Sequence, residues 1–234
     1  MKKHFEDFKY QKSPHTKMII TVGGTSEARS YNFPEMASNP ESRAYFIKNI
    51  VDLALDWEAD GLDIDWEWGY RPSTQEHKDG YEMLMKELIE SARPEGLLIS
   101  NAISPSAYFG DNTPIGAIED SDYLVVMSYS YSGGWSASSG HHSGLDKSEE
   151  LGFNYWKGRG LDEEKIHVGI PFYGNRFRGA SAPGQGFEEF SAVTHQQVQD
   201  FISEGYSLIE DDTSGSYIYS SSPEDIVFLI ALVT

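Results

Sequence analysis

Short apolar runs alternate with helical patterns along most of this 234-residue chain. The run at 18–22 predicts a buried strand that ends at Gly23-Gly24, and a helix is expected to begin at Asn39-Pro40, with Asn39 as its N-cap. Such an alternation is typical of βαβ units and a parallel sheet. Further strands are predicted at 61–68, 97–104, 122–129 and 165–172, and further helices at about 81–92, 146–157 and 194–204. Five parallel strands fit either an open sheet or part of a barrel.

The charge of the chain limits its partners. It carries 18 basic and 37 acidic side chains, a net charge of -19, and such a surface repels nucleic-acid phosphates and anionic lipids. It has no cysteine, which excludes a disulfide framework, a thiol nucleophile and a thiolate metal site. No stretch approaches the roughly 18 apolar residues that a membrane helix needs. The N-terminus lacks the apolar segment of a signal peptide.

The predicted strand that begins at Gly61 carries three acidic residues at alternate positions, Asp63, Asp65 and Glu67. Side chains alternate along a strand, so these three carboxyl groups project to one face at intervals of ~6.6 Å. The residues between them, which project to the other face, are Leu62, Ile64 and Trp66. Like charges in a partly buried row raise one another's pKa, so at least one carboxyl is expected to keep its proton. A protonated carboxyl beside ionised ones is what a general acid requires.

The acidic row has two alternative interpretations. The first is the solvated face of an edge strand, which the apolar opposite face argues against, because a strand buried on one side turns its acids toward a cavity or a partner. The second is a divalent cation site. The segment contains no histidine, and strand spacing spreads the oxygens too far apart for a single ion. The sequence therefore predicts no metal site.

Residues 60–67 match DGxDxDWE, and through this signature the chain resembles glycoside hydrolase family 18, the chitinases and their relatives. Three further segments resemble the family in the family's order: 17–24 the third strand, 127–129 the M-x-Y of strand six, and 165–174 the G-x-P-F-Y-G segment of strand seven. Thr21 and Val22 stand where the family usually has serine. The resemblance covers roughly residues 17 to 225.

The resemblance implies an α/β fold of the (β/α)8 TIM-barrel type, with the carboxylate row opening at the C-terminal end of the strands. Strands three to seven are recognisable, so an incomplete barrel is expected. The expected domains are a partial catalytic barrel at 1–177, a small α+β insertion at 178–222, and the start of a truncated last barrel element at 223–234. The family's eighth-strand tryptophan has no counterpart, because the last tryptophan is Trp156.

The resemblance also implies a retaining, substrate-assisted mechanism. Glu67 is then the residue that protonates the glycosidic oxygen and later acts as the base toward water. Asp65 turns the substrate acetamide into place and stabilises the oxazolinium ion, while Asp63 holds or shares a proton with Asp65. Tyr129 donates a hydrogen bond to the acetamido oxygen, which is the nucleophile.

Aromatic and apolar residues are expected to line the sugar pocket. By resemblance these are Met127, Trp135 and Tyr173. Trp68 is a further candidate, because it lies at the exit of the acidic strand, where it either stacks on a sugar or covers the barrel rim. Trp135 follows two glycines in a loop, which favours exposure, whereas Trp66 is expected in the core. The expected partners are chitin or N-acetylglucosamine oligomers, with no cofactor, no nucleic acid and no membrane. The chain is expected to be monomeric and, by resemblance, extracellular.

Two departures from the family pattern affect the expected site. Ser130 stands where the family usually has aspartate after M-x-Y, and Asn175 replaces a common arginine, with Arg176 one place later as a possible substitute. His141-His142 lies in a loop rich in serine and glycine and is predicted to be solvated. The leading hypothesis is hydrolysis of β-1,4-linked N-acetylglucosamine. The alternatives are a glycan-binding protein without turnover, an endo-β-N-acetylglucosaminidase, and a fragment that does not fold alone.

Overall fold

The computed structural model describes residues 2–25, 30–67 and 73–229. The chain divides into two compact units, Met1–Val126 with Trp156–His167, and Met127–Tyr155 with Val168–Thr234. Two five-stranded sheets organise the chain, one whose described strand pairs are parallel and one that is antiparallel.

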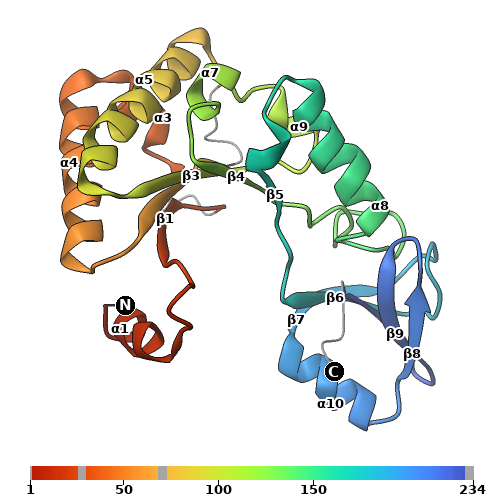
Figure 1. The fold of residues 1–234 in the computed structure, drawn as a ribbon. Helices are drawn as coiled ribbons and strands as arrows, with labels where there is room; N and C mark the ends of the chain where they lie inside the picture. The colour runs from red at the N-terminus through yellow and green to blue at the C-terminus, as the bar shows by residue number, and fades with distance from the viewer. Residues whose placement is uncertain (1, 26–29, 68–72, 230–234) are drawn as a thin grey trace. The chain divides into compact units, whose positions relative to one another are not determined.

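The parallel sheet follows the order of the sequence, β1-β2-β3-β4-β5 (Figure 1). Its strands are β1 (Ile19–Gly23), β2 (Gly61–Asp65), β3 (Leu98–Ile103), β4 (Tyr123–Val126) and β5 (Ile166–Val168). The apolar runs predict all five: β1 is shifted by one residue from its run, and each of the other four strands is shorter than its run. Neighbouring strands from β1 to β4 pair in parallel, as the alternation with helices indicates.

One helix of the first unit, α1 (Lys2–Gln11), precedes the parallel strands, and the other helices lie between them in the sequence. These other helices are α3 (Phe33–Ser38), α4 (Pro40–Asp56), α5 (Gln75–Ala92), α6 (Ala107–Gly110) and α7 (Ile115–Ile118), with short 3-10 turns at Arg93–Glu95 and Glu163–Lys165. The start of α4 is the predicted one: the Asn39 side chain accepts hydrogen bonds from the backbone N–H groups of Glu41 and Ser42, with proline at the first helical position. Helices α3, α4 and α5 lie on one side of the sheet (Figure 1).

The core of the first unit explains the apolar face of β2. Leu62 and Ile64 are completely buried. Trp66, which was predicted to be a core residue, packs between Phe33 and Tyr81 with ring centroids 5.3 and 4.8 Å away. The face of β2 that carries Leu62 and Ile64 therefore belongs to the packed core and cannot hold a substrate.

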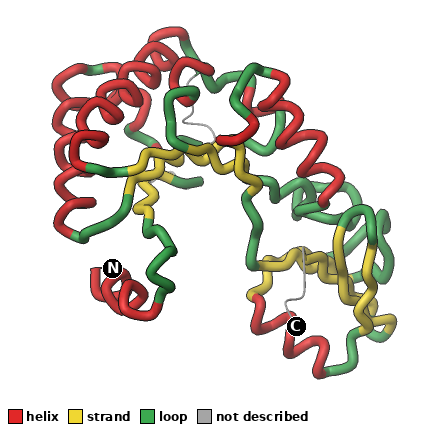
Figure 2. Tube along the Cα trace, viewed as in Figure 1, coloured by secondary structure: helices red, strands yellow, loops and turns green. Residues whose placement is uncertain are grey.

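The second unit contains the antiparallel sheet, in the order β7-β6-β10-β9-β8. Its strands are β6 (Tyr173–Arg178), β7 (Glu189–Thr194), β8 (Ser207–Asp211), β9 (Gly215–Ser221) and β10 (Glu224–Leu229). Its longest helix, α10 (His195–Ser203), packs beside β7 and β6, as the tube in Figure 2 shows. The segment predicted as a helix at 146–157 contains α8 (Leu145–Lys147), a π-helical stretch (Ser148–Phe153) and α9 (Asn154–Gly158).

Strand β10 differs from the expectation that 223–234 begins another barrel element. It lies in the middle of the antiparallel sheet, paired with β6 on one side and β9 on the other. Ile226 and Phe228 pack in one cluster with Phe177, whereas Val227 and Leu229 pack in the cluster on the α10 side. A central strand buried on both faces needs a continuous apolar run, which explains the apolar residues at 226–229.

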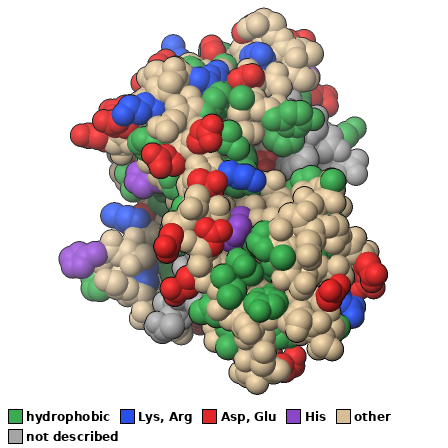
Figure 3. Space-filling model, turned by 90° about the vertical axis from the view of Figure 1, so that its right-hand side faces the viewer, with side chains coloured by type: hydrophobic (Ala, Val, Ile, Leu, Met, Phe, Trp, Pro, Cys, Tyr) green, Lys and Arg blue, Asp and Glu red, His purple; other side chains and the backbone are tan. Residues whose placement is uncertain are grey.

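Acidic side chains are spread over the face shown in Figure 3, in keeping with the net charge of -19. None of the helices in the described part of the chain has the length and apolar character needed to cross a bilayer.

Candidate active site

The three carboxylates predicted to share one face lie on β2 and just beyond its end. Asp63 and Asp65 are the third and fifth residues of the strand, and Glu67 follows it by two residues. Asp63 is only 5% exposed, while Asp65 and Glu67 are partly buried. Burial therefore decreases toward the carboxyl end of the strand, which is the end where barrel enzymes place their reacting groups.

Asp63 lies in a row of polar side chains that crosses the sheet at one register. It pairs with Thr21 of β1 and with Ser100 of β3, and Ser100 in turn pairs with Tyr123 of β4. The Ser100 hydroxyl donates a hydrogen bond of 2.6 Å to Asp63 Oδ1, and Thr21 also hydrogen-bonds to this carboxyl. Thr21, which departs from the family's serine, therefore still supplies a hydroxyl.

Burial raises the pKa of Asp63, and the hydrogen bonds from Ser100 and Thr21 offset only part of this effect. The direction is the one expected for a carboxyl in a partly buried acidic row. A carboxyl with a raised pKa can hold a proton for a neighbour at a pH where an exposed aspartate is ionised.

Backbone contacts fix the two ends of the acidic strand. At the carboxyl end, the N–H of Gly24 donates to the carbonyl of Asp65 at 2.8 Å. A Cβ on Gly23, which has a φ of +123°, would lie 2.0 Å from that same carbonyl oxygen, so only glycine fits. At the other end, Asp60 accepts a hydrogen bond of 2.8 Å from the Met18 N–H, so the first aspartate of the signature joins β1 to β2.

The pocket residues predicted in the second unit form a separate group. The rings of Tyr129 and Tyr173 lie edge to face with centroids 6.3 Å apart. The hydroxyl groups of Ser130 and Tyr173 are 3.3 Å apart, within hydrogen-bonding distance. Ser130 has a φ of +62°, an uncommon conformation for a residue other than glycine. Met127 is partly buried, and Trp68 lies outside the described residues.

His142 was predicted to be solvated, and this prediction is wrong. Its side chain is completely buried, and its ring packs against Tyr173 with centroids 5.0 Å apart. Burial lowers the pKa of His142 to about 4, so the imidazole is neutral at neutral pH. Its neighbour His141 is also largely buried, against Phe228, and lies 3.4 Å from Asp211.

Trp135 is 66% exposed, as its place after two glycines predicts. A Cβ on Gly133 would lie 2.5 Å from the indole ring of Trp135, so this glycine leaves the space that the ring occupies. The loop is held by Ser139, whose backbone N–H donates to the Gln185 carbonyl at 2.7 Å and whose hydroxyl donates to the Ala182 carbonyl at 2.9 Å. A broad apolar ring held in an exposed position is suited to stacking on a sugar.

Asn175, which replaces the family's common arginine, and its neighbour Arg176 both form hydrogen bonds within the second unit. The Asn175 side-chain amide is buried and donates to the Ser132 carbonyl at 2.8 Å. Arg176 donates from Nε to Oδ2 of the buried Asp225 at 2.8 Å, and the Tyr206 hydroxyl donates to the same oxygen at 2.7 Å. Arg176 is therefore engaged with the core of the antiparallel sheet and does not replace the missing arginine.

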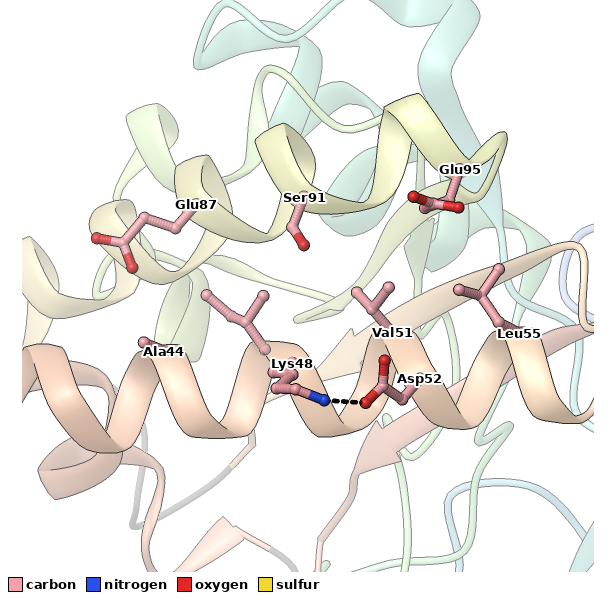
Figure 4. A pocket seen from close by; sticks show the side chains of 9 residues that line it. Ala44, Lys48, Val51, Asp52, Leu55, Glu87, Ser91 and Glu95 are labelled. Atoms are coloured by element: carbon pink, nitrogen blue, oxygen red, sulfur yellow. Dashed lines mark hydrogen bonds and ion pairs between the residues drawn. The ribbon is translucent and has the colours of Figure 1, made fainter.

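A groove of about 370 Å³ is lined by side chains of α4, of α5 and of the 3-10 turn that follows α5 (Figure 4). Val51 and Leu55 contribute apolar lining, and the rim includes Glu87 and the ion pair between Lys48 and Asp52. None of the predicted site residues lines it. Elsewhere in residues 2–25, 30–67 and 73–229, no three His, Asp or Glu side chains lie close enough together to hold a metal ion.

Comparisons with known proteins support one family. Residues 1–229 match the family described as Glycosyl hydrolases family 18. Probable chitinase 10 of Drosophila melanogaster is 31% identical over 192 residues, a match that covers 75% of this chain and 8% of that protein. Probable chitinase 2 of the same species is 31% identical over 174 residues, covering 70% of this chain and 36% of that protein. The match therefore spans 8% of the length of one of these relatives and 36% of the length of the other.

A solved structure matches over a larger share of both chains. A class V chitinase from Nicotiana tobaccum, solved in complex with NAG4, has a TM-score of 0.83 and 26% sequence identity, over 98% of this chain and 74% of that chain. The fold is therefore of the predicted TIM-barrel type, with a second, antiparallel sheet. Because the family match runs through all the described residues, the chain belongs to glycosyl hydrolases family 18.

Proposed function

We propose that this chain hydrolyses β-1,4 linkages between N-acetylglucosamine residues in chitin or chitooligosaccharides. The observation that carries the proposal is the acidic row of β2, in which the buried Asp63 has a raised pKa and Glu67 follows the carboxyl end of the strand. The matched relatives are named chitinases, and one solved neighbour is in complex with NAG4.

The mechanism we propose is retaining and substrate-assisted. Glu67 donates its proton to the glycosidic oxygen as the bond to the leaving sugar breaks, and the acetamido oxygen of the same substrate attacks the anomeric carbon. Asp65 orients the acetamide and balances the positive charge of the oxazolinium ion, with Asp63 sharing its proton. Water, deprotonated by Glu67, then opens this intermediate.

Aromatic and apolar side chains complete the proposed sugar pocket. Tyr129 donates a hydrogen bond to the acetamido oxygen, while Met127, Trp68 and Tyr173 shape the pocket. The high exposure of Trp135 supports a role in stacking on a sugar ring. We further propose that the chain acts as a monomer outside the cell and needs no cofactor.

A second candidate function is binding of chitooligosaccharides without turnover. Ser130 supports it, because this residue places a neutral hydroxyl beside Tyr173 where the family usually has a carboxylate. A weakened polar network at that position would slow hydrolysis more than it would weaken binding.

The test compares the N-acetylglucosamine tetramer with the glucosamine tetramer, which lacks the acetamide nucleophile. We expect cleavage of the acetylated tetramer only, with the first product in the β configuration by proton NMR. The glucosamine oligomer is cationic and the chain has a net charge of -19, so electrostatic repulsion would not explain its resistance. Comparable cleavage of both tetramers would overturn the mechanism, and binding of the acetylated tetramer without products would favour the second candidate.

A further inference from the structure

Four polar side chains cross the parallel sheet at one register, from Thr21 on β1 through Asp63 and Ser100 to Tyr123 on β4. Residues paired in neighbouring strands project to the same face, so the four side chains lie side by side. Only one of them is a carboxyl, and the other three carry hydroxyl groups. The row therefore concentrates hydrogen-bonding capacity on Asp63.

The hydrogen bonds of the row have a direction. The hydroxyl of Ser100, which is 1% exposed, donates its single proton to Asp63 Oδ1 at 2.6 Å. Tyr123 hydrogen-bonds to Ser100, and because the serine proton is already used, the tyrosine hydroxyl donates to the serine oxygen. Such a chain polarises each successive bond and strengthens the last one, which reaches Asp63.

In the part of the chain that the structure describes, the titratable neighbours of Asp63 lie on β2, β4 and α5. Asp65 lies two residues further along the same strand, and Tyr123 of β4 and Tyr81 of α5 both interact with Asp63 electrostatically. From β5, His167 contacts the ring of Tyr123, with centroids 5.4 Å apart. None of these contacts places a cation against Asp63, so hydroxyl donors are what stabilises its ionised form.

We infer that Ser100 and Tyr123 are positioning residues for the reaction, which hold the Asp63 carboxyl in one orientation and stabilise its ionised form while the shared proton is on Asp65. This inference rests on the proposed function, in which Asp63 and Asp65 share one proton. A donor lost from Asp63 draws that proton away from Asp65, the group that must orient the acetamide. The pH below which both carboxyls of the pair are protonated, and the pair is inactive, then becomes higher.

The test is the pH profile of N-acetylglucosamine tetramer hydrolysis in Ser100→Ala, Ser100→Thr and Tyr123→Phe. In Ser100→Ala we expect the acid limb of kcat/KM to move up by about one pH unit and kcat to fall about tenfold, with little change in KM. Ser100→Thr keeps the hydroxyl and should restore the wild-type profile. Tyr123→Phe should shift the limb in the same direction by a smaller amount.

Ser121→Ala is the matched control. Ser121 is a completely buried serine whose hydroxyl accepts a hydrogen bond of 2.7 Å from Asn101, the residue after Ser100 on β3, whose side chain projects to the other face. This variant should leave the acid limb in place. An unmoved profile in Ser100→Ala, or an equal shift in Ser121→Ala, would overturn the inference.

A carboxyl ¹³C NMR titration gives a readout that does not depend on turnover. With the Asp63 signal assigned from Asp63→Asn, Ser100→Ala should raise the pKa of Asp63 and Ser121→Ala should not. If the wild-type chain cleaves nothing, the proposed function fails while this titration still decides whether Ser100 stabilises the ionised Asp63.

Discussion

At the scale of single residues, burial shifts two side chains near the predicted site toward their neutral forms. It raises the pKa of Asp63 and lowers the pKa of His142 to about 4. Each shift arises because the charged form loses hydration that the protein does not fully replace. The two groups affect stability in opposite pH ranges: ionisation of Asp63 disfavours the folded state as the pH rises, and protonation of His142 disfavours it as the pH falls.

His142 is predicted to make stability depend on pH. Between its ordinary pKa of 6.5 and its folded value of about 4, the unfolded chain binds a proton that the folded chain does not. The free energy of unfolding should therefore fall by about 3 kcal/mol as the pH falls across this range. Urea unfolding of the wild-type chain and of His142→Gln at a series of pH values measures this contribution as the difference between the two curves.

The exposed His15 provides the control for this prediction. His15→Gln should follow the wild-type pH dependence. Parallel curves for the wild type and His142→Gln would show that the buried imidazole is not the source of the dependence.

Residue patterns predict some of these environments and miss others. Period-two alternation correctly predicts that Leu62, Ile64 and Trp66 are buried, because the pattern is local to one strand. The burial of His142 could not be predicted this way, since the ring that covers it, Tyr173, comes from β6. Likewise, Ser100 carries no local signal; it became notable only when strand pairing placed it beside Asp63.

At the scale of elements, the loop that carries Trp135 is held in one shape by contacts within its unit. Ser139 ties the loop to the segment at 182–185 through its backbone and its hydroxyl. Phe190 of β7 lies beside the indole, with ring centroids 6.5 Å apart. The exposed ring is thus preorganised, which lowers the entropy lost when a ligand binds.

Gly133→Ala should weaken oligosaccharide binding by displacing Trp135. The new methyl group would lie 2.5 Å from the indole ring, so the ring must move. We expect the Kd of the N-acetylglucosamine tetramer to rise about tenfold, because one stacked aromatic contact is lost. Titration calorimetry in a Glu67→Gln background keeps the ligand intact during the measurement.

Gly158→Ala is the matched control, because a Cβ at that glycine would meet no atom within 4 Å. Its Kd should equal that of the parent. Tight binding by Gly133→Ala would contradict the role given to the Trp135 ring.

The order of the parallel strands could be predicted from the sequence because apolar runs and helical patterns alternate there. The strands of the antiparallel sheet could not be predicted in this way, although the helix beside them was predicted at 194–204. Strand β10 is the clearest case: its apolar run is compatible with a helix or a buried strand, and only its pairing with β6 and β9 decides between them.

At the scale of the whole molecule, the family signature lies on β2 and at its two ends in the first unit, and the predicted pocket residues Tyr129, Trp135 and Tyr173 lie in the second unit. The net charge of -19 gives no attraction to an uncharged oligosaccharide, so recognition depends on hydrogen bonds and apolar contacts. In the proposed function the acidic row serves hydrolysis, and Glu67 is the proton donor.

Turnover of the N-acetylglucosamine tetramer by the wild-type chain, by Glu67→Gln and by Glu150→Gln shows whether Glu67 is the proton donor. Glu150 is an exposed acid outside the proposed site and should be dispensable. We predict that Glu67→Gln loses at least about 100-fold in kcat because the proton donor is gone, while it still binds the tetramer. Equal turnover by the wild type and Glu67→Gln, or no turnover by any of the three proteins, would contradict the account.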